Sequence, residues 1–327
     1  MNHSILTVSG LDIELKRSGC FVPLVRNTSF FVGSSESVCL VGESGSGKTV
    51  TALAIMGLLP LSFRIKSGSI LFDGIELARL DQNKLNRIRG RRLSMVFQEP
   101  MTALNPVFTI GSQIKEGIAA HERLTSKELN RRTLDILERV GMPDPQTAFN
   151  AYPHELSGGL RQRAMIAMAL SCHPDMLIAD EPTTALDVSL QAHILGLLSE
   201  LRRGSGLALL FITHNLGVVA QVAERVIIVY AGKIVEEAGV FDLFDSPLHP
   251  YTKGLLESIP YFKDGSGGVD RERRLKSIPG NIPPLEAIPH GCPFQDRCGE
   301  VMDVCRRIEP TEVSTGRAHK VACHLYG

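Results

Sequence analysis

The chain has 327 residues, with 35 Lys and Arg balanced by 35 Asp and Glu and a near-neutral isoelectric point. Nucleic-acid-binding proteins usually carry a basic excess, so this balance argues against that class. A length above 300 residues favours a main domain plus an appendage. The N-terminal residues do not read as a signal peptide, and the longest apolar stretch, near 50–63, is too short for a membrane span. We therefore expect a soluble chain whose membrane role would run through a partner.

A glycine-rich loop follows the first buried strand, which the apolar run 37–42 predicts. It fits the pattern G-x-x-x-x-G-K-[ST] through Gly42, Glu43, Ser44, Gly45, Ser46, Gly47, Lys48 and Thr49. The glycines let backbone N–H groups surround phosphate oxygens, and the helix that follows directs its positive end there. Lys48 would reach the β and γ phosphates, and the Thr49 hydroxyl would ligate Mg²⁺. The loop predicts a nucleoside triphosphate site.

The stretch from about 108 to 172 lacks a clear strand and is predicted to be a helical insert. Within it we expect one helix to have Ser126 as its N-cap and to end at Gly141. Ser157, Gly158 and Gly159 precede a further long helix, which is a second anion-binding geometry. One triphosphate needs only one such helix start. The simplest explanation is a dimer in which these residues close on nucleotide held by the opposite subunit.

A second buried strand, 176–180, ends in Asp180 and Glu181. Adjacent carboxylates at a strand end also occur as solvated turns, but the loop at 42–49 favours function. Asp180 is suited to hold Mg²⁺ through water, and Glu181 is suited to polarise an attacking water as a general base. The apolar run 207–213 predicts a third buried strand, which His214 follows. Between the strands at 176–180 and 207–213, helical spacing predicts a helix with one apolar stripe, made of Leu190, Ile194, Leu197, Leu198 and Leu201.

The order of these motifs resembles the ATP-binding subunit of ABC transporters over about 230 residues. The elements that carry it are the 42–49 loop, Gln98, "LSGG" (156–159), "LIADEP" (177–182), "ALD" (185–187) and His214. The resemblance implies an α/β fold of the P-loop NTPase ABC cassette type, with a RecA-like parallel core sheet, an antiparallel β subdomain and a helical subdomain. The cassette is expected at 1–245, with the helical subdomain at about 99–172.

The resemblance also implies roles that the residues alone do not. Gln98 would link Mg²⁺ and the attacking water to the helical insert, and His214 would contact the γ-phosphate; by itself, His214 reads as an ordinary loop histidine. The 157–159 segment would cap the partner's nucleotide, and Asp187 would lie at the dimer seam. The nearest candidate for an aromatic residue that stacks on adenine is Phe21.

Two positions depart from the family pattern. Leu160 stands where a glutamine usually follows LSGG, so an amide that would assist the signature contact is missing. Asn215 follows His214 where an aspartate is more usual, so it supplies no charge. We expect a modest loss rather than an inactive site, because Ser157 and the two glycines carry the anion-binding chemistry.

The stretches 98–106 and 246–260 resemble the ATP-binding subunits of bacterial dipeptide and oligopeptide importers, a group that also serves nickel and glutathione uptake. The 246–327 region, where prolines multiply and periodicity fades, is therefore expected to be a small, loop-rich importer C-terminal region. Taken alone, "HPYT" predicts a helix start with Pro250 in the first turn and His249 or Thr252 as the cap.

Four cysteines gather in this C-terminal region, with the spacing C-x5-C-x6-C-x17-C: Cys292, Cys298, Cys305 and Cys323. The spacing fits neither zinc ribbons nor the close ferredoxin run, and predicts only a metal site of unknown metal. Some members of the importer group hold a [4Fe–4S] cluster in such a region, so the resemblance implies iron–sulfur. Zn²⁺ and four unrelated thiols are the alternatives.

The resulting hypothesis is an ATPase that energises peptide import. The resemblance implies a second, different ATP-binding subunit, two membrane permeases, an extracytoplasmic solute-binding protein, and a peripheral position at the cytoplasmic face of the inner membrane. The rivals are a soluble ABC-type ATPase acting on ribosomes or DNA, a small-molecule kinase, and a regulatory module without turnover. Each rival fits the sequence less well. A soluble ABC-type ATPase usually has two cassettes or coiled coils, which this chain lacks. A small-molecule kinase has no use for LSGG, and a module without turnover does not need Glu181.

Overall fold

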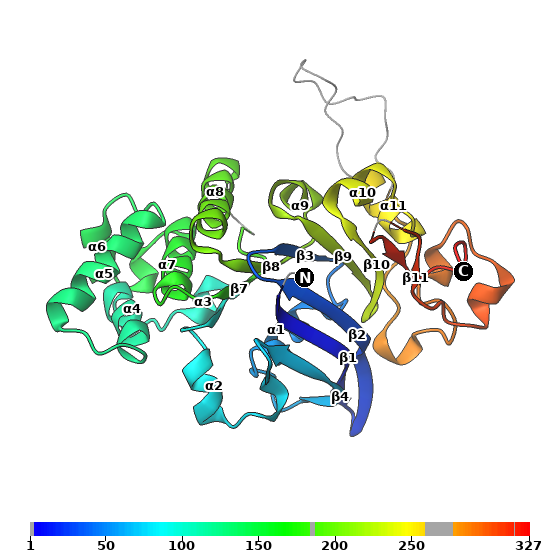
Figure 1. Cartoon of the computed structure of the whole chain (residues 1–327), viewed down its shortest axis with the longest axis horizontal. Helices are drawn as coiled ribbons and strands as arrows, with labels where there is room; N and C mark the ends of the chain where they lie inside the picture. The colour runs from blue at the N-terminus through cyan, green and yellow to red at the C-terminus, as the bar shows by residue number, and fades with distance from the viewer. Residues whose placement is uncertain (1–2, 184–186, 259–276, 317) are drawn as a thin grey trace, which may run out of the picture.

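A computed structural model describes residues 3–183, 187–258, 277–316 and 318–327. It contains an antiparallel sheet, a larger mixed sheet and a group of helices (Figure 1). The antiparallel sheet has the order β2-β1-β4-β5, with β1 (Ser4–Arg17), β2 (Cys20–Gly33), β4 (Phe63–Phe72) and β5 (Ile75–Glu76). The larger sheet has the order β11-β12-β10-β9-β3-β8-β7-β6. Its strands are β3 (Ser37–Val41), β6 (Leu93–Val96), β7 (Met176–Asp180), β8 (Ala208–Thr213), β9 (Arg225–Tyr230), β10 (Lys233–Gly239), β11 (Val313–Ser314) and β12 (Lys320–Val321).

The helices fall into groups at different places around the larger sheet. They are α1 (Lys48–Ile55), α2 (Gln82–Ile88), α3 (Pro100–Ala103), α4 (Ile110–Ala119), α5 (Ser126–Arg139), α6 (Pro145–Asn150), α7 (Gly158–Leu170), α8 (Val188–Ser205), α9 (Leu216–Val222), α10 (Val240–Asp245) and α11 (Pro250–Glu257). Helices α4 to α6 lie at one end of the long axis, and the C-terminal residues lie at the other (Figure 1). The 108–172 stretch, which is described throughout, contains helices and turns but no strand, as predicted.

The central strands of the larger sheet are parallel and buried on both faces. β3 pairs with β8 and β9, and β8 pairs with β7, all in parallel. Every residue of β3, β7 and β8 is buried, which confirms the strands predicted from continuous apolar runs. In β3, Val38 and Leu40 belong to the core beneath the antiparallel sheet, whereas Cys39 and Val41 belong to the core shared with the helices. The sheet therefore separates two apolar cores.

Helix α5 begins one residue earlier than the sequence prediction. Its N-cap is Thr125, not Ser126, because the Thr125 hydroxyl accepts the Glu128 N–H while the Glu128 carboxylate accepts the Thr125 N–H at 2.8 Å. This reciprocal capping box needs the threonine and the glutamate three residues apart, a spacing that Ser126 does not have. Gly141 adopts a left-handed φ of 77° just beyond the helix, so the predicted helix end is confirmed.

The C-terminal region is only partly loop-rich. The predicted start of α11 is confirmed: His249 is the N-cap, its Nδ1 accepts the Tyr251 N–H at 3.0 Å, and Pro250 is the first helical residue. Burial lowers the pKa of His249 to about 3, which keeps the ring neutral and able to accept that bond. Further along, short 3-10 turns cover Leu285–Ala287, Gln295–Arg297 and Asp303–Arg306. β12 then pairs with β10, so the region extends the core sheet, which the sequence does not predict.

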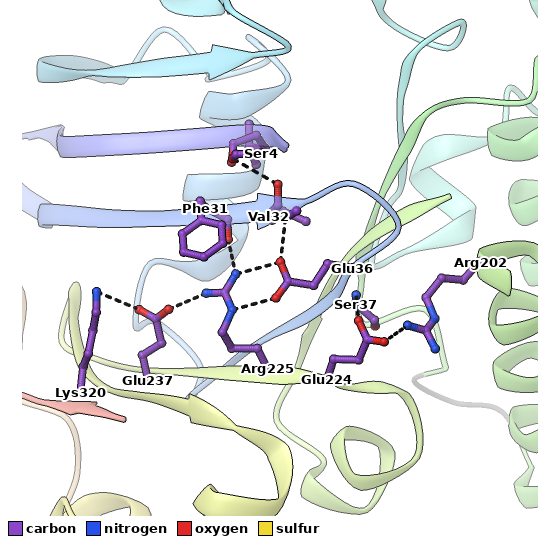
Figure 2. A network of polar contacts seen from close by, with 12 residues as sticks. Ser4, Phe31, Val32, Glu36, Ser37, Arg202, Glu224, Arg225, Glu237 and Lys320 are labelled. Carbon is purple, nitrogen blue, oxygen red and sulfur yellow. Dashed lines mark hydrogen bonds and ion pairs between the residues drawn. The ribbon is translucent and has the colours of Figure 1, made fainter. Parts of the chain in front are cut away.

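A half-buried arginine joins the two sheets to the C-terminal region (Figure 2). Arg225 of β9 donates from Nε and Nη2 to the Glu36 carboxylate at 2.8 and 3.0 Å, and from Nη2 to the Phe31 carbonyl of β2 at 2.7 Å. It also pairs with Glu237 of β10, which in turn lies 3.9 Å from Lys320 of β12. One guanidinium thus neutralises two carboxylates where β2, β9 and β10 meet.

Replacement of Arg225 by methionine is expected to lower the free energy of unfolding by about 3 kcal/mol, because it leaves two poorly solvated carboxylates without their shared cation. Urea denaturation of the purified chain measures the change. Lys320→Met is the control: this side chain is 41% exposed, so the loss should stay below about 1 kcal/mol. Equal losses in the two variants would contradict the role assigned to Arg225.

Candidate functional site

The glycine-rich loop lies between β3 and α1, as predicted. Two of its glycines are required by the local geometry. A Cβ on Gly42 would lie 2.2 Å from the carbonyl oxygen of Val229 in the neighbouring strand, so a side chain does not fit there. Gly47 is the N-cap of α1 and has a φ of 99°, a conformation that other residues rarely adopt. The loop therefore lies close against the edge of the sheet, and the N-terminal end of α1 points into the loop.

Lys48 lies at the centre of this loop. Its Nζ donates to the carbonyl oxygens of Gly42 and Glu43 at 2.8 and 2.9 Å and to the Ser46 hydroxyl at 3.2 Å. Burial lowers the pKa of Lys48, and the nearby Glu181 and Asp180 carboxylates oppose that effect. The ammonium group is thus held in place with part of its hydration removed, a state in which attraction to a polyanion is strong.

Asp180 has the properties of a ligand for a cation. Its side chain is buried, and burial raises its pKa, although a hydrogen bond with the Thr49 hydroxyl acts in the opposite direction. Its Oδ1 atom has no hydrogen-bond partner among the described residues. A buried carboxylate oxygen left without a partner, beside a hydroxyl, suits Mg²⁺, which prefers oxygen ligands. The residues present therefore fit the predicted ion, with Asp180 and Thr49 as its ligands or as ligands of its water shell.

Glu181 brings together the residues predicted to be catalytic. Its Oε1 lies 2.8 Å from Nδ1 of His214, and its Oε2 accepts a hydrogen bond from Nε2 of Gln98 at 3.2 Å. The backbone of Glu181 has a φ of 46°, which costs energy for a residue with a side chain. Residues from three separate parts of the chain, after β6, β7 and β8, thus meet at one edge of the sheet.

A pocket of about 130 Å³ joins the loop to this group. It is lined by Leu24, Ser44, Gly45, Gly47, Lys48, Thr49, Val50, Gln98 and Glu181. Phe21, the predicted adenine-stacking residue, does not line it; its ring lies 3.6 Å from the guanidinium carbon of Arg64 in a cation–π contact. Leu24, three residues further along β2, does line it. The role of Phe21 at adenine stays a prediction.

The 157–159 segment lies apart from this pocket. Ser157 is the N-cap of α7, and its hydroxyl accepts the Leu160 N–H at 3.4 Å. Ser157 and Gly158 are exposed, and none of the described pocket-lining residues comes from this segment. The helix start is thus exposed and separate from this chain's own phosphate pocket.

Residues that flank these motifs serve the local fold. Asp187 is the N-cap of α8 and accepts the Leu190 N–H at 2.8 Å; Ala185 and Leu186 of the "ALD" motif lie outside the described residues. Asn215 caps α9 by accepting the Gly217 N–H at 2.9 Å. The missing charge at 215 therefore does not leave the helix start uncapped.

Gln162 is a residue that the sequence analysis missed. It lies in α7, is buried, and donates from Nε2 to the carbonyl oxygen of Pro182 at 2.6 Å. Pro182 directly follows Glu181, so this bond ties the helix that begins at Ser157 to the loop that carries the acidic pair. A buried glutamine on the apolar side of a helix is the signal that could have identified it.

The four C-terminal cysteines are free thiols. The Cys292 N–H donates to the Cys305 carbonyl at 2.7 Å, and burial raises the pKa of Cys292 to about 11, with the other three thiols acting in the same direction. Among the described residues, however, no group of three or more His, Cys, Asp or Glu side chains is arranged to hold a metal ion. The thiols are neighbours, but their arrangement does not fit the predicted [4Fe–4S] cluster or Zn²⁺ site.

Two protein-family models match the chain. The model described as "ABC transporter" matches residues 25–184, and that described as "Oligopeptide/dipeptide transporter, C-terminal region" matches residues 235–305. The first match contains the phosphate loop, the 157–159 segment and the acidic pair. The second contains α11 and three of the four cysteines.

Relatives match over nearly the whole length. The chain is 46% identical to a putative peptide import ATP-binding protein of Brucella melitensis, covering 98% of this chain and 96% of that one. It is 47% identical to the dipeptide transport ATP-binding protein DppD of Bacillus subtilis, covering 99% and 95%, and 45% identical to the oligopeptide transport ATP-binding protein AppD of the same species, covering 99% and 97%.

A solved structure of a dimeric bacterial ABC transporter cassette superimposes with a TM-score of 0.66 at 27% identity, covering 72% of this chain and 98% of that one. A post-hydrolysis state of the same cassette, bound to ADP and Pi, matches equally well. These likenesses confirm the predicted fold class. The share of this chain that they leave uncovered is consistent with an additional C-terminal region.

Replacement of Lys48 by alanine is expected to weaken binding of nucleoside triphosphate by at least about tenfold, because it removes the buried cation that faces the phosphates. Titration of the purified chain with ATP and Mg²⁺ measures the dissociation constant. Lys84→Ala, which removes an exposed ammonium group paired with Asp81, should bind like the unmodified chain. Unchanged affinity in Lys48→Ala would rule out the loop as the phosphate site.

Proposed function

The chain belongs to the ATP-binding proteins of ABC transporters that carry the oligopeptide/dipeptide transporter C-terminal region, and on this premise we propose that it hydrolyses ATP to drive the import of peptides. The relatives compared are named for peptides, dipeptides or oligopeptides, which favours peptides over nickel or glutathione. The observation that carries the proposal is the meeting of Gln98 and Glu181 with Lys48 and Thr49 in one pocket, with the His214 ring within hydrogen-bond distance of Glu181.

The chemistry follows from what each side chain offers. Backbone N–H groups of the 42–49 loop and the Lys48 ammonium would bind the β and γ phosphates. Asp180 and Thr49 would hold Mg²⁺, which neutralises phosphate charge when bound. Glu181 would accept the proton of the attacking water, with the Gln98 amide and the His214 ring fixing the direction of its carboxylate. The strained backbone at Glu181 is consistent with a side chain held for that purpose.

We infer that hydrolysis needs a second ATP-binding subunit. Ser157, Gly158 and Gly159 present an exposed helix start that does not line this chain's own pocket. Such a helix start binds anions, so the proposed ligand is the nucleotide of a partner subunit. Gln162 then gives a route by which contact at Ser157 reaches the Glu181 loop. We propose that this partner subunit is a different protein.

The proposed membrane contact lies next to Gln98. Among the described residues of the 98–108 stretch, the apolar side chains of Met101, Val107 and Phe108 are 59%, 69% and 51% exposed. Adjacent exposed apolar side chains suit a protein interface. They support docking to two permease subunits, with solute delivered by an extracytoplasmic binding protein. Within the described residues, none of the helices has both the length and the apolar character needed to cross a bilayer. The likeness to importer ATP-binding proteins supports the proposed peripheral position at the cytoplasmic face.

Glu181→Gln is expected to bind ATP within about threefold of the unmodified chain but to lose at least about 100-fold in hydrolysis, since the amide cannot accept a proton from water. Phosphate release by the chain assembled with its second ATP-binding subunit, together with titration by ATP, provides the measurement. Glu200→Gln, at an exposed position of α8, serves as the matched control and should hydrolyse normally. A near-normal rate of ATP hydrolysis in Glu181→Gln would contradict the assignment of Glu181 as the general base.

The [4Fe–4S] cluster remains a proposal for the C-terminal cysteines. The four thiols offer suitable donors, and the backbone bond between Cys292 and Cys305 keeps two of them adjacent. Binding would require the thiols to move closer together, because they do not form a metal group as they stand. When bound, such a cluster would hold together a region that has little core of its own.

Protein purified without oxygen should contain about four iron and four sulfide per chain if this proposal holds. Cys305→Ser should lose both, whereas Cys20→Ser, outside the group, should keep both. A finding of zinc without sulfide would mean that the cysteines hold Zn²⁺ instead of the cluster. The absence of iron, sulfide and zinc would show that the cysteines hold no such metal.

A further inference from the structure

We propose that Arg297 and Tyr251, from the C-terminal region, are positioning residues for the phosphate loop, so that this region forms part of the working nucleotide site. The inference rests on the proposed function, because it concerns the affinity of the loop for ATP. It assigns to the C-terminal region a role in ATP binding that is separate from any metal at the cysteines.

The first contact is a two-pronged ion pair with the loop itself. Glu43 is the second residue of the glycine-rich motif, and its carboxylate accepts hydrogen bonds from Nη1 and Nη2 of Arg297 at 2.9 and 3.0 Å. The Arg297 side chain is 7% exposed. Parallel bonds between a guanidinium and a carboxylate fix distance and direction together, and little water competes for them here.

The second contact holds the backbone of the same residue. The Glu43 N–H donates to the Tyr251 hydroxyl at 2.9 Å, and Tyr251 is fully buried in α11. Both the backbone and the side chain of Glu43 are therefore bound by the C-terminal region. Glu43 also contributes one of the carbonyl oxygens that hold the Lys48 ammonium at 2.9 Å. A shift of Glu43 would consequently move the cation that faces the phosphates.

Arg297 is itself held firmly by its surroundings. Its Nε donates to the Pro279 carbonyl at 2.8 Å, and its guanidinium lies near the rings of Tyr230 and Phe294. Tyr230, Tyr251 and Phe294 pack edge-on or tilted against one another, with centroids 4.8 to 5.5 Å apart. This aromatic cluster joins the core sheet to the C-terminal region, and Arg297 extends from it to the loop.

Charge explains why the contact should affect ATP in particular. A carboxylate in a phosphate loop repels the triphosphate unless a cation neutralises it. Arg297 supplies that cation from outside the motif. Removal of Arg297 alone would leave the Glu43 charge uncompensated in the phosphate loop, whereas removal of both charges would leave no uncompensated carboxylate at position 43. A purely structural role of Arg297 predicts no such rescue.

The experiment compares the KM for ATP and the kcat of the full chain, assembled with its second ATP-binding subunit, with those of its variants. Arg297→Gln is expected to raise KM about tenfold with kcat changed less than about threefold. Glu43→Gln combined with Arg297→Gln should bring KM back to within about threefold of the unmodified chain. Arg17→Gln is the matched control, because Arg17 makes an exposed ion pair with Glu286 of the same region at 2.9 Å, away from the loop. It should behave like the unmodified chain.

Tyr251→Phe keeps the aromatic packing and removes only the hydroxyl, so it tests the second contact even if Arg297→Gln does not fold. It is expected to raise KM about threefold, since the Glu43 N–H loses its acceptor. An unchanged KM in Tyr251→Phe or Arg297→Gln, or a double variant as impaired as Arg297→Gln alone, overturns the inference. Failure of the unmodified chain to bind ATP would instead overturn the proposed function.

Discussion

The burial of parallel strands on both faces is the constraint from which the site follows. β3 and β7 are parallel neighbours of β8, so the residues after all three strands meet at one edge of the sheet. This places Lys48 and Glu181 in one pocket and brings His214 within hydrogen-bond distance of Glu181. The same apolar surroundings remove water from the side chains of Lys48 and Asp180. Burial lowers the pKa of Lys48 and raises the pKa of Asp180, so it favours the neutral form of each group. The core thus builds the site and also makes its charges reactive toward a polyanion and a cation.

Two regions at opposite ends of the molecule reach the nucleotide site by different kinds of contact. From the helical end, Gln162 of α7 makes one hydrogen bond to the loop after the acidic pair. From the C-terminal end, Arg297 and Tyr251 hold Glu43 by an ion pair and a backbone bond. The first contact acts on the residue proposed to activate water, and the second acts on the residues proposed to bind phosphate. Binding and hydrolysis can therefore be tuned separately.

Local patterns predicted what depends on short segments of sequence. The three central strands, the loop with Lys48, the start of α11 at His249 and the end of α5 were all readable, because each depends on neighbours in the chain. The pairing of β1 with β2, which places Phe21 opposite Lys16, was not, since strand register is set by the partner strands. Nor were the pairing of β12 with β10 or the contact between Arg297 and Glu43, whose partners are 254 residues apart in sequence. Long-range polar pairs leave no periodic signal in a single sequence.

The acidic residue at position 43 can be understood through thermodynamic linkage. Alone, its charge weakens phosphate binding, so a neutral residue would serve the loop better. Paired with Arg297, it lets the loop and the C-terminal region stabilise each other. If docking of that region improves ATP affinity by a given factor, ATP must favour docking by the same factor, because coupling between two equilibria is reciprocal. The C-terminal region would then be bound most firmly when nucleotide is present, and any partner that competes for Arg297 would lower ATP affinity without touching the phosphate loop.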